Sequence, residues 1–182
     1  RSELEAFVSE DLAWRYVKMT CNTEDKSLEE AYLFFVNEIE PQISPLTDQL
    51  NRKLIESPFI KELDHDKYFI YLRGIQKEIE IFREANVPLM AEIATESQKY
   101  GSIVGSITVE LDGKELTLQQ ASNYLKNPDR AKREEAFKKI NEKRQAHAQE
   151  LDELFNKLVS LRNQVAINAG FANFRDYMFA AM

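Results

Sequence analysis

The amino-acid sequence predicts a mainly α-helical fold, an antiparallel bundle of helices with one small β-hairpin. Apolar residues recur at three- and four-residue spacing along most of the 182 residues, which is the period of helices with one buried face. A single Asp-Gly pair stands between two short alternating runs, the strongest local signal for a hairpin. Only five glycines and five prolines occur, so long continuous elements are expected.

Five helices are expected before the hairpin, joined by short connections as in an antiparallel bundle. Ser27 and Glu30 have the spacing of a capping box, which would begin the second helix, and Pro41 would end it. Pro45 would open the third helix at its first position, and that helix would stop before Pro58. The expected ranges are about 3–20, 27–40, 45–56, 66–85 and 88–100.

The hairpin is expected to have strands at about 103–111 and 114–118. Asp112-Gly113 fits its turn, because a type I′ turn needs positive φ at both central residues. Gly101 and Gly105 would mark a bend into it. We expect residues 1–116 to form a helical lobe that ends in this hairpin.

The remaining residues, 117–182, are expected to form a second helical segment. Thr117 and Gln120 form another capping box, and this short helix breaks at Asn127-Pro128. Asp129 would then cap one long helix to about Asn168, with Gly170 just beyond its end. Asn173 would cap a last helix that runs to Met182.

Composition and charge exclude several classes of function. A net charge of −7 argues against bulk attraction to nucleic acid or to an anionic membrane. No apolar run reaches the roughly 20 residues that a membrane helix needs, and the first residues do not resemble a signal peptide. The single cysteine, Cys21, allows no internal disulfide, so a reducing cytoplasm is the expected location. The chain starts without Met, from which we expect a processed or cloned end.

No catalytic or metal-binding residue can be assigned, and the substrate-binding residues stay unknown. A zinc site on one helix needs two imidazoles one turn apart with a Glu between them, and neither His65 nor His147 has such a partner. Both histidines are interpreted as surface or capping residues. Cys21 has no base nearby and is interpreted as a small helical residue. The sequence has no Gly-rich phosphate loop and no Gly-x-Ser-x-Gly elbow.

Two further features have both a structural and a functional interpretation. Residues 126–144 are locally basic but contain one aromatic residue, Phe137, so a solvated helix face is favoured over a patch for an acidic partner or a substrate carboxylate. The N-terminal aromatic residues are expected to pack in the core, the alternative being a groove for peptide side chains. They are Trp14, Tyr16, Tyr32, Phe34 and Phe35.

Several stretches, taken in order, resemble the N-terminal region of the oligoendopeptidase F-like enzymes of peptidase family M3. Residues 84–89 (Glu-Ala-Asn-Val-Pro-Leu) and the hairpin at 107–121 carry the first part of the resemblance. Residues 124–137 are similar to a family helix rich in Arg and Glu. Residues 161–178 are similar to a family segment in which Gly-Phe is followed by a Tyr. The stretches at 11–15 and 38–41 fit more loosely, and the resemblance covers essentially the whole chain.

The resemblance implies that the fold is the N-terminal part of a zincin-like oligopeptidase. Enzymes of this family are zinc metalloendopeptidases that hydrolyse short peptides in a channel between two mostly helical halves. Their zinc is held by a His-Glu-x-x-His helix and a distant Glu in the C-terminal half. This sequence ends before that motif, so residues 117–182 would lead into an absent catalytic domain.

The expected partners are therefore the C-terminal catalytic half of the same protein and short unstructured peptides. The segment would form one wall of the channel, would hold no zinc and would be inactive by itself, while the parent protein would be a zinc enzyme. No nucleic-acid or membrane partner is expected. The alternative is a stand-alone helical module that binds peptides or proteins without catalysis.

Overall fold

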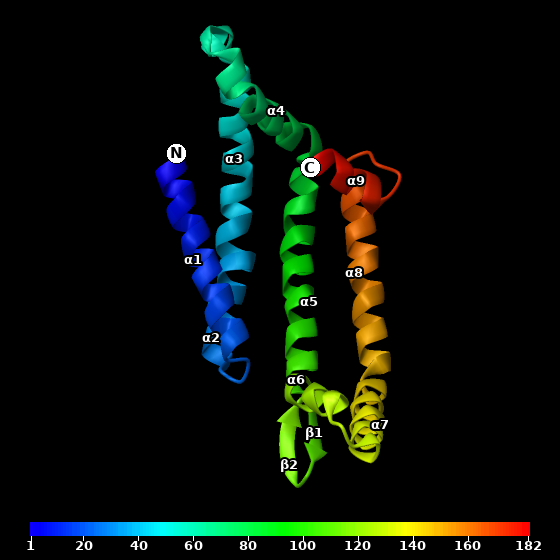
Figure 1. The fold of residues 1–182 in the computed structure, drawn as a ribbon. Coiled ribbons are helices and arrows are strands. Elements are labelled where there is room, and N and C mark those ends of the chain that lie inside the picture. Colours follow the sequence, from blue (N-terminus) through cyan, green and yellow to red (C-terminus); the bar gives the residue numbers. More distant parts are fainter.

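The structure is a computed structural model that describes residues 1–182, and it confirms a mainly helical chain with one β-hairpin. Figure 1 shows an elongated, open arrangement of two helical layers. One layer contains α1 (Ser2–Cys21), α2 (Lys26–Phe34) and α3 (Glu40–Ile55). In the other layer α5 (Val87–Ser106) packs beside α8 (Ala148–Asn168), and α4 (His65–Ile81) crosses between the layers.

The second and third predicted helices are one nearly continuous helical rod, so the predicted break at Pro41 is wrong. A π-helical turn, Phe35–Ile39, joins α2 to α3, and the N–H of Glu40 donates to the carbonyl of Phe35. Pro41 lies in the first turn of α3, where its missing N–H costs little. Pro45 lies inside α3 and does not open a new helix. The π turn lies just before Pro41, and the helix continues through Pro45 without a break.

Three other predicted helix ends are shifted. Asp25 caps α2, because its carboxylate accepts from the N–H of Ser27 at 2.9 Å, so Ser27 is not the capping residue. Asp64 caps α4 by accepting from Lys67. The helix α4 ends at Ile81, short of the predicted residue 85. A short 3₁₀ turn, Glu84–Asn86, then leads into α5.

The hairpin is confirmed, but its first strand is shorter than predicted. Residues 103–106, together with Gly101 and Gly105, continue α5, which leaves β1 at Thr108–Leu111 and β2 at Lys114–Thr117. Ile103 and Val104 fit the apolar pattern of a strand as well as that of a helix. In the structure they belong to α5. The strands pair antiparallel, with Val109 opposite Leu116. Asp112 and Gly113 have φ of 50° and 71°, as the predicted turn requires.

The long helix predicted from Asp129 to Asn168 is two helices. Thr117 and Gln120 form the predicted capping box at α6 (Leu118–Ser122), and Asp129 caps α7 (Arg130–Ala146). The chain then leaves helical geometry at His147 and resumes as α8, and Figure 1 shows the change of direction. Gly170, at φ 89°, ends α8, and Asn173 caps α9 (Phe174–Ala181), both as predicted.

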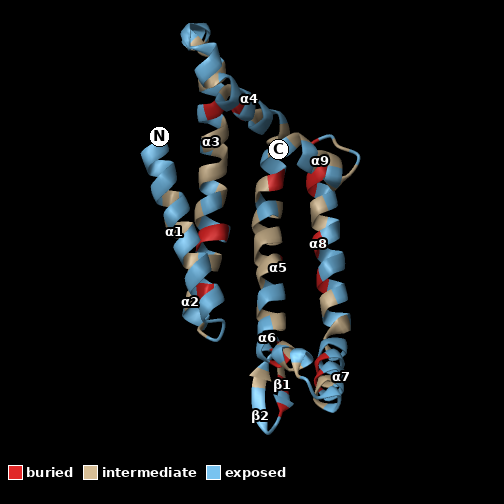
Figure 2. Cartoon of the chain, viewed as in Figure 1, coloured by how far each residue is buried: buried red, intermediate tan, exposed pale blue.

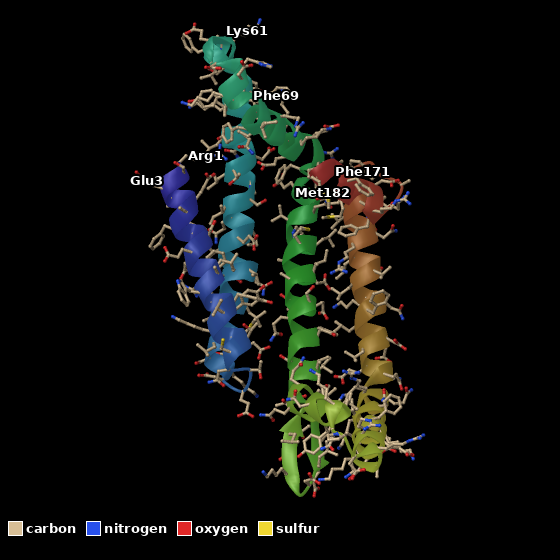
Figure 3. All side chains as sticks on the ribbon, in the orientation of Figure 1. Arg1, Glu3, Lys61, Phe69, Phe171 and Met182 are labelled. Atoms are coloured by element: carbon tan, nitrogen blue, oxygen red, sulfur yellow. The ribbon has the colours of Figure 1, made fainter.

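Burial is sparse, and Figure 2 shows it concentrated on the inner faces of a few helices. Only 19 of 182 residues are buried, so the two layers do not share a thick hydrophobic core. The best-packed cluster joins the hairpin to α6 and α7 and comprises Ile107, Val109, Leu111, Leu118, Ala121, Ala136 and Ile140. Many large apolar side chains stay exposed, including Phe69 near the end of the molecule marked by Lys61 in Figure 3. None of the helices is both long and apolar enough to cross a bilayer.

Candidate functional site

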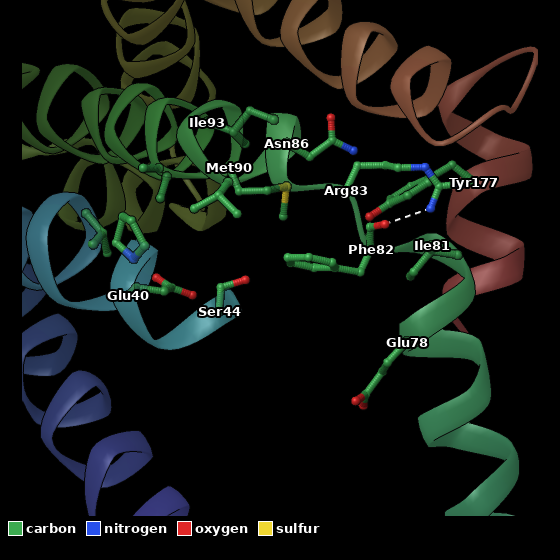
Figure 4. Close-up of a pocket in the computed structure, with 15 residues that line it drawn as sticks. Glu40, Ser44, Glu78, Ile81, Phe82, Arg83, Asn86, Met90, Ile93 and Tyr177 are labelled. Carbon is green, nitrogen blue, oxygen red and sulfur yellow. Dashed lines mark hydrogen bonds between the residues drawn. The ribbon is translucent and has the colours of Figure 1, made fainter. Parts of the chain in front are cut away.

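The most apolar large hollow of the molecule lies where α3, α4, α5 and α9 meet, and Figure 4 shows it in close-up. It has a volume of about 400 Å³ and is lined by 15 residues, nine of them hydrophobic. Phe82 and Met90 project into it from the α4–α5 corner and from α5. Polar side chains from α3 and α4 stand on the opposite side, namely Glu40, Ser44 and Glu78. The hollow therefore offers an apolar wall and a carboxylate rim.

The α4–α5 corner is held in place by two polar side chains. The guanidinium of Arg83 donates to the carbonyls of Glu80, Phe82 and Ala169, at 2.9, 2.6 and 3.2 Å. It thus satisfies carbonyls at the ends of both α4 and α8, where helices leave them unpaired. Buried Asn86 donates to the carbonyl of Val165 at 3.0 Å. The apolar wall of the hollow is therefore anchored to α8.

A smaller hollow of about 300 Å³ adjoins the first, between α3 and α4, and the two share Glu40, Ser44, Glu78 and Phe82. Asn51, only 1% exposed, donates its Nδ2 to Glu78 Oε2 at 2.8 Å. Its Oδ1 and the Oδ1 of Asp48 are both buried and lack a hydrogen-bond donor. The other oxygen of Asp48 accepts from Arg52 Nε at 2.7 Å. We call the two adjoining hollows the α3–α4 cleft.

The charge of the cleft is negative. Partial desolvation raises the pKa of the Glu40 carboxyl above its usual range, and burial raises the pKa of the Tyr177 hydroxyl. Arg83 also lines the cleft, but its guanidinium is committed to backbone carbonyls. The carboxylates of Glu40 and Glu78 therefore face the cleft without a cation between them. This arrangement suits binding of a donor-rich group, and it places no nucleophile beside a base.

The two histidines and the cysteine, which the sequence offers as candidate catalytic or metal-binding residues, do not lie together in the structure. Exposed His65 begins α4 and lies 3.5 Å from Asp66, while His147 stands at the α7–α8 junction with its Nδ1 3.2 Å from Glu150. The prediction that His147 lies within a continuous helix is thus wrong. Cys21 is exposed at the end of α1. No three His, Cys, Asp or Glu side chains are grouped so as to hold a metal ion.

The basic segment at 126–144 behaves as a solvated helix face. Lys132 pairs with Asp112 at 3.1 Å, and Lys138 and Lys139 pair with Glu134 and Glu135 at 2.7 Å each. Three of the eight basic side chains of the segment thus pair with carboxylates of the same chain.

The N-terminal aromatic residues are only partly in the core. Phe35 is buried under the guanidinium of Arg15, which lies 5.7 Å from the ring centre, whereas Trp14 and Phe34 are more than half exposed. Tyr16 and Tyr32 pack against each other at 5.9 Å. The expectation of core packing thus holds for Phe35 and fails for Trp14, Tyr16 and Phe34, which are all more than half exposed. Sequence reasoning missed the α3–α4 cleft. Its signal was a polar row at helical spacing on α3, namely Glu40, Ser44, Asp48 and Asn51.

Comparison with known proteins gives a family match for the first part of the chain. Residues 1–82 match the family model of the Peptidase M3 N-terminal domain. No curated protein matches the sequence. The predicted resemblance to the N-terminal portion of an M3 oligoendopeptidase F-like peptidase is confirmed by this match together with the fold.

Three solved structures show the same fold. An oligoendopeptidase F from Bacillus anthracis str. Ames superposes with a TM-score of 0.84 at 23% identity, over 91% of this chain and 30% of its own. A second oligoendopeptidase F gives 0.84 at 24% identity, over 98% and 33%. PZ peptidase A, solved with an inhibitor, gives 0.83 at 26% identity, over 91% and 29%. The chain thus spans about a third of the length of these structures.

Proposed function

We propose that this chain is the N-terminal region of a zinc-dependent oligopeptidase that hydrolyses short peptides, and that it forms one wall of the substrate channel. The single observation that carries the proposal is the match of residues 1–82 to the Peptidase M3 N-terminal domain. The fold likeness to PZ peptidase A, a structure that contains an inhibitor, supports it. Because the chain spans a third of these relatives, the remainder would supply the catalysis.

Zinc is assigned to the parent enzyme and not to these residues. The donor set here does not fit a zinc site, because His65 and His147 lie on different elements and neither has two further ligands beside it. A catalytic zinc takes three protein ligands and one open position. The zinc ligands would therefore come from the catalytic half.

Exposed apolar pairs support packing against such a half. Leu46 and Leu50, 56% and 49% exposed, stand one turn apart on α3. Phe155 and Val159, 62% and 47% exposed, repeat the spacing on α8, while Leu154 and Leu158 face inward. Side chains at i and i+4 share one helix face. Contiguous exposed apolar surface of this kind typically marks an interface.

Hydrolysis of a quenched fluorescent peptide tests the proposal. The polypeptide that the native gene encodes in full should cleave it, lose the activity in a zinc chelator and regain it with added zinc. The 182-residue chain alone should not cleave it. Leu46→Gln with Leu50→Gln should lower the activity of the full polypeptide, and Lys53→Gln, exposed on the same helix, should not.

The opposite results identify the alternative. A native gene that stops after Met182, with no peptidase activity in its product, would overturn the proposal and favour a stand-alone peptide-binding module. Chelator-resistant hydrolysis by the 182-residue chain itself would also overturn it.

A further inference from the structure

Two residues that line the α3–α4 cleft each carry a buried oxygen without a hydrogen-bond donor. Asn51 Oδ1 and Asp48 Oδ1 have no partner, although Asn51 is 1% exposed and both residues line the smaller hollow. The orientation of the Asn51 amide is fixed, because its nitrogen donates to Glu78. An unpaired buried acceptor costs about 1–3 kcal/mol, so native structures rarely leave one unpaired. The geometry points to a donor supplied from outside the chain.

The charge around these oxygens selects a cation. Glu40 and Glu78 line both parts of the cleft, and no basic residue lines the smaller hollow. Arg52 occupies the far oxygen of Asp48 and leaves the other free. A neutral donor such as a hydroxyl would satisfy one acceptor and leave the carboxylates uncompensated. A guanidinium or ammonium group has several donors and a positive charge, so it would pair with the acceptors and also compensate the carboxylates.

The apolar wall beside the acidic hollow favours one kind of molecule as the carrier of the cation. Phe82 lines both hollows, and Met90, half exposed, lines the larger one with Ile93. A free polyamine has no bulky apolar group to place there. A peptide with an apolar residue beside Arg or Lys would fill the wall and the acidic hollow together.

We propose that the α3–α4 cleft binds the basic side chain of a peptide, with a neighbouring apolar residue on Phe82 and Met90. The inference rests on the proposed function in taking peptides as ligands, and it adds a preference for basic residues. Asp48, Asn51 and Glu78 would determine how tightly the cleft binds the basic side chain, and this binding would not require hydrolysis.

Calorimetric titration of the full polypeptide with blocked dipeptides tests the preference. Acetyl-Leu-Arg-amide should bind about tenfold tighter than acetyl-Leu-citrulline-amide, which has the same shape without the charge. Glu78→Gln should reduce that ratio to near one, and Glu142→Gln, an exposed carboxyl on α7, should preserve it. Equal affinity for the Arg and citrulline peptides in the wild-type protein would overturn the proposal.

Two further measurements do not depend on how a variant folds. A benzophenone-alanine–Arg-amide probe, irradiated with the wild-type protein, should label Met90 or Phe82. Labelling confined to other segments would overturn the site even if hydrolysis is intact. Spermidine should bind more weakly than acetyl-Leu-Arg-amide, and the reverse order would show a polyamine site instead. Because none of these readouts uses hydrolysis, their failure is distinguishable from failure of the peptidase proposal.

Discussion

Asn86 and Val165, 79 positions apart, are joined by a 3.0 Å hydrogen bond from the side-chain amide of Asn86 to the Val165 carbonyl. The Oδ1 of the same amide accepts from Asn168 Nδ2 at 2.8 Å. Asn86 thus uses both ends of its side chain to fix the α4–α5 corner to α8. Asn86 lies in the Glu-Ala-Asn-Val-Pro-Leu stretch that first indicated the family, and its contact supplies a physical reason for an asparagine there.

Replacing this residue should loosen the corner. Asn86→Ala removes both side-chain hydrogen bonds and leaves the Val165 carbonyl with the backbone N–H of Ala169 as its donor. Because each lost bond contributes about 0.5–1.5 kcal/mol, we expect a loss of about 1–3 kcal/mol in the free energy of unfolding. Urea denaturation followed by circular dichroism would measure it. Asn163→Ala, at an exposed position of α8, should change stability little. Equal stabilities for the two variants would mean that the tether contributes nothing.

Acid should weaken the contact between α5 and α8. Lys157 and Lys99 hydrogen-bond the Glu96 carboxylate at 2.8 Å each and lower its pKa below the ordinary 4.5. Because the folded pKa is the lower one, the ionised carboxylate stabilises the fold above about pH 4.5, and this contribution is lost as the pH falls through the folded pKa. Glu96→Gln should therefore be less stable at neutral pH and lose less stability on acidification.

Thermal unfolding measured from pH 7 to pH 3 would show that the melting temperature of Glu96→Gln falls less steeply with decreasing pH than that of the wild type. Glu92→Gln is the matched control, because its more exposed carboxylate contacts the same Lys157 at 3.0 Å. The control should keep the wild-type slope. A Glu96→Gln profile parallel to that of the wild type would contradict the assigned role of the ion pair.

Two glycine substitutions should have opposite effects. Gly170 has φ of 89°, and it ends α8 with its N–H donating to Ile167 while the N–H of Phe171 donates to Ala166. Gly170→Ala forces a side chain into left-handed geometry and should cost about 1–2 kcal/mol. Gly101 lies inside α5 with open space around it, so Gly101→Ala should gain about 0.5–1 kcal/mol. Melting temperatures that shift in the same direction would refute this assignment.

The hairpin core should be the most sensitive to truncation. Leu111, 2% exposed, packs in the cluster formed with α6 and α7. Leu111→Ala should destabilise the chain by about 2–5 kcal/mol, through lost burial and the cavity left behind. Leu50→Ala, at a position 49% exposed, should cost much less in the chain studied alone. Guanidinium unfolding compares the two, and a larger loss for Leu50 would mean that the core lies elsewhere.

The parts of the fold that are specified locally were predictable from sequence. The Asp112-Gly113 turn, the Thr117 capping box and the glycine after α8 each depend on a few adjacent residues and their backbone preferences. The family resemblance was also readable, since it rests on the order of short motifs. The prolines at 41 and 45 misled the prediction, because the helix continues past Pro41 from a π-helical turn and keeps Pro45 in its interior.

By itself, then, the sequence determined a helical chain with one hairpin and a resemblance to the N-terminal portion of M3 oligopeptidases. Only the tertiary structure brought Asp48 and Asn51 of α3 together with Glu78 of α4 and Phe82 at the corner, and showed two oxygens there without donors. Local sequence periodicity records which face of a helix is apolar. It does not record which helices meet, because that choice depends on packing between residues far apart in the chain.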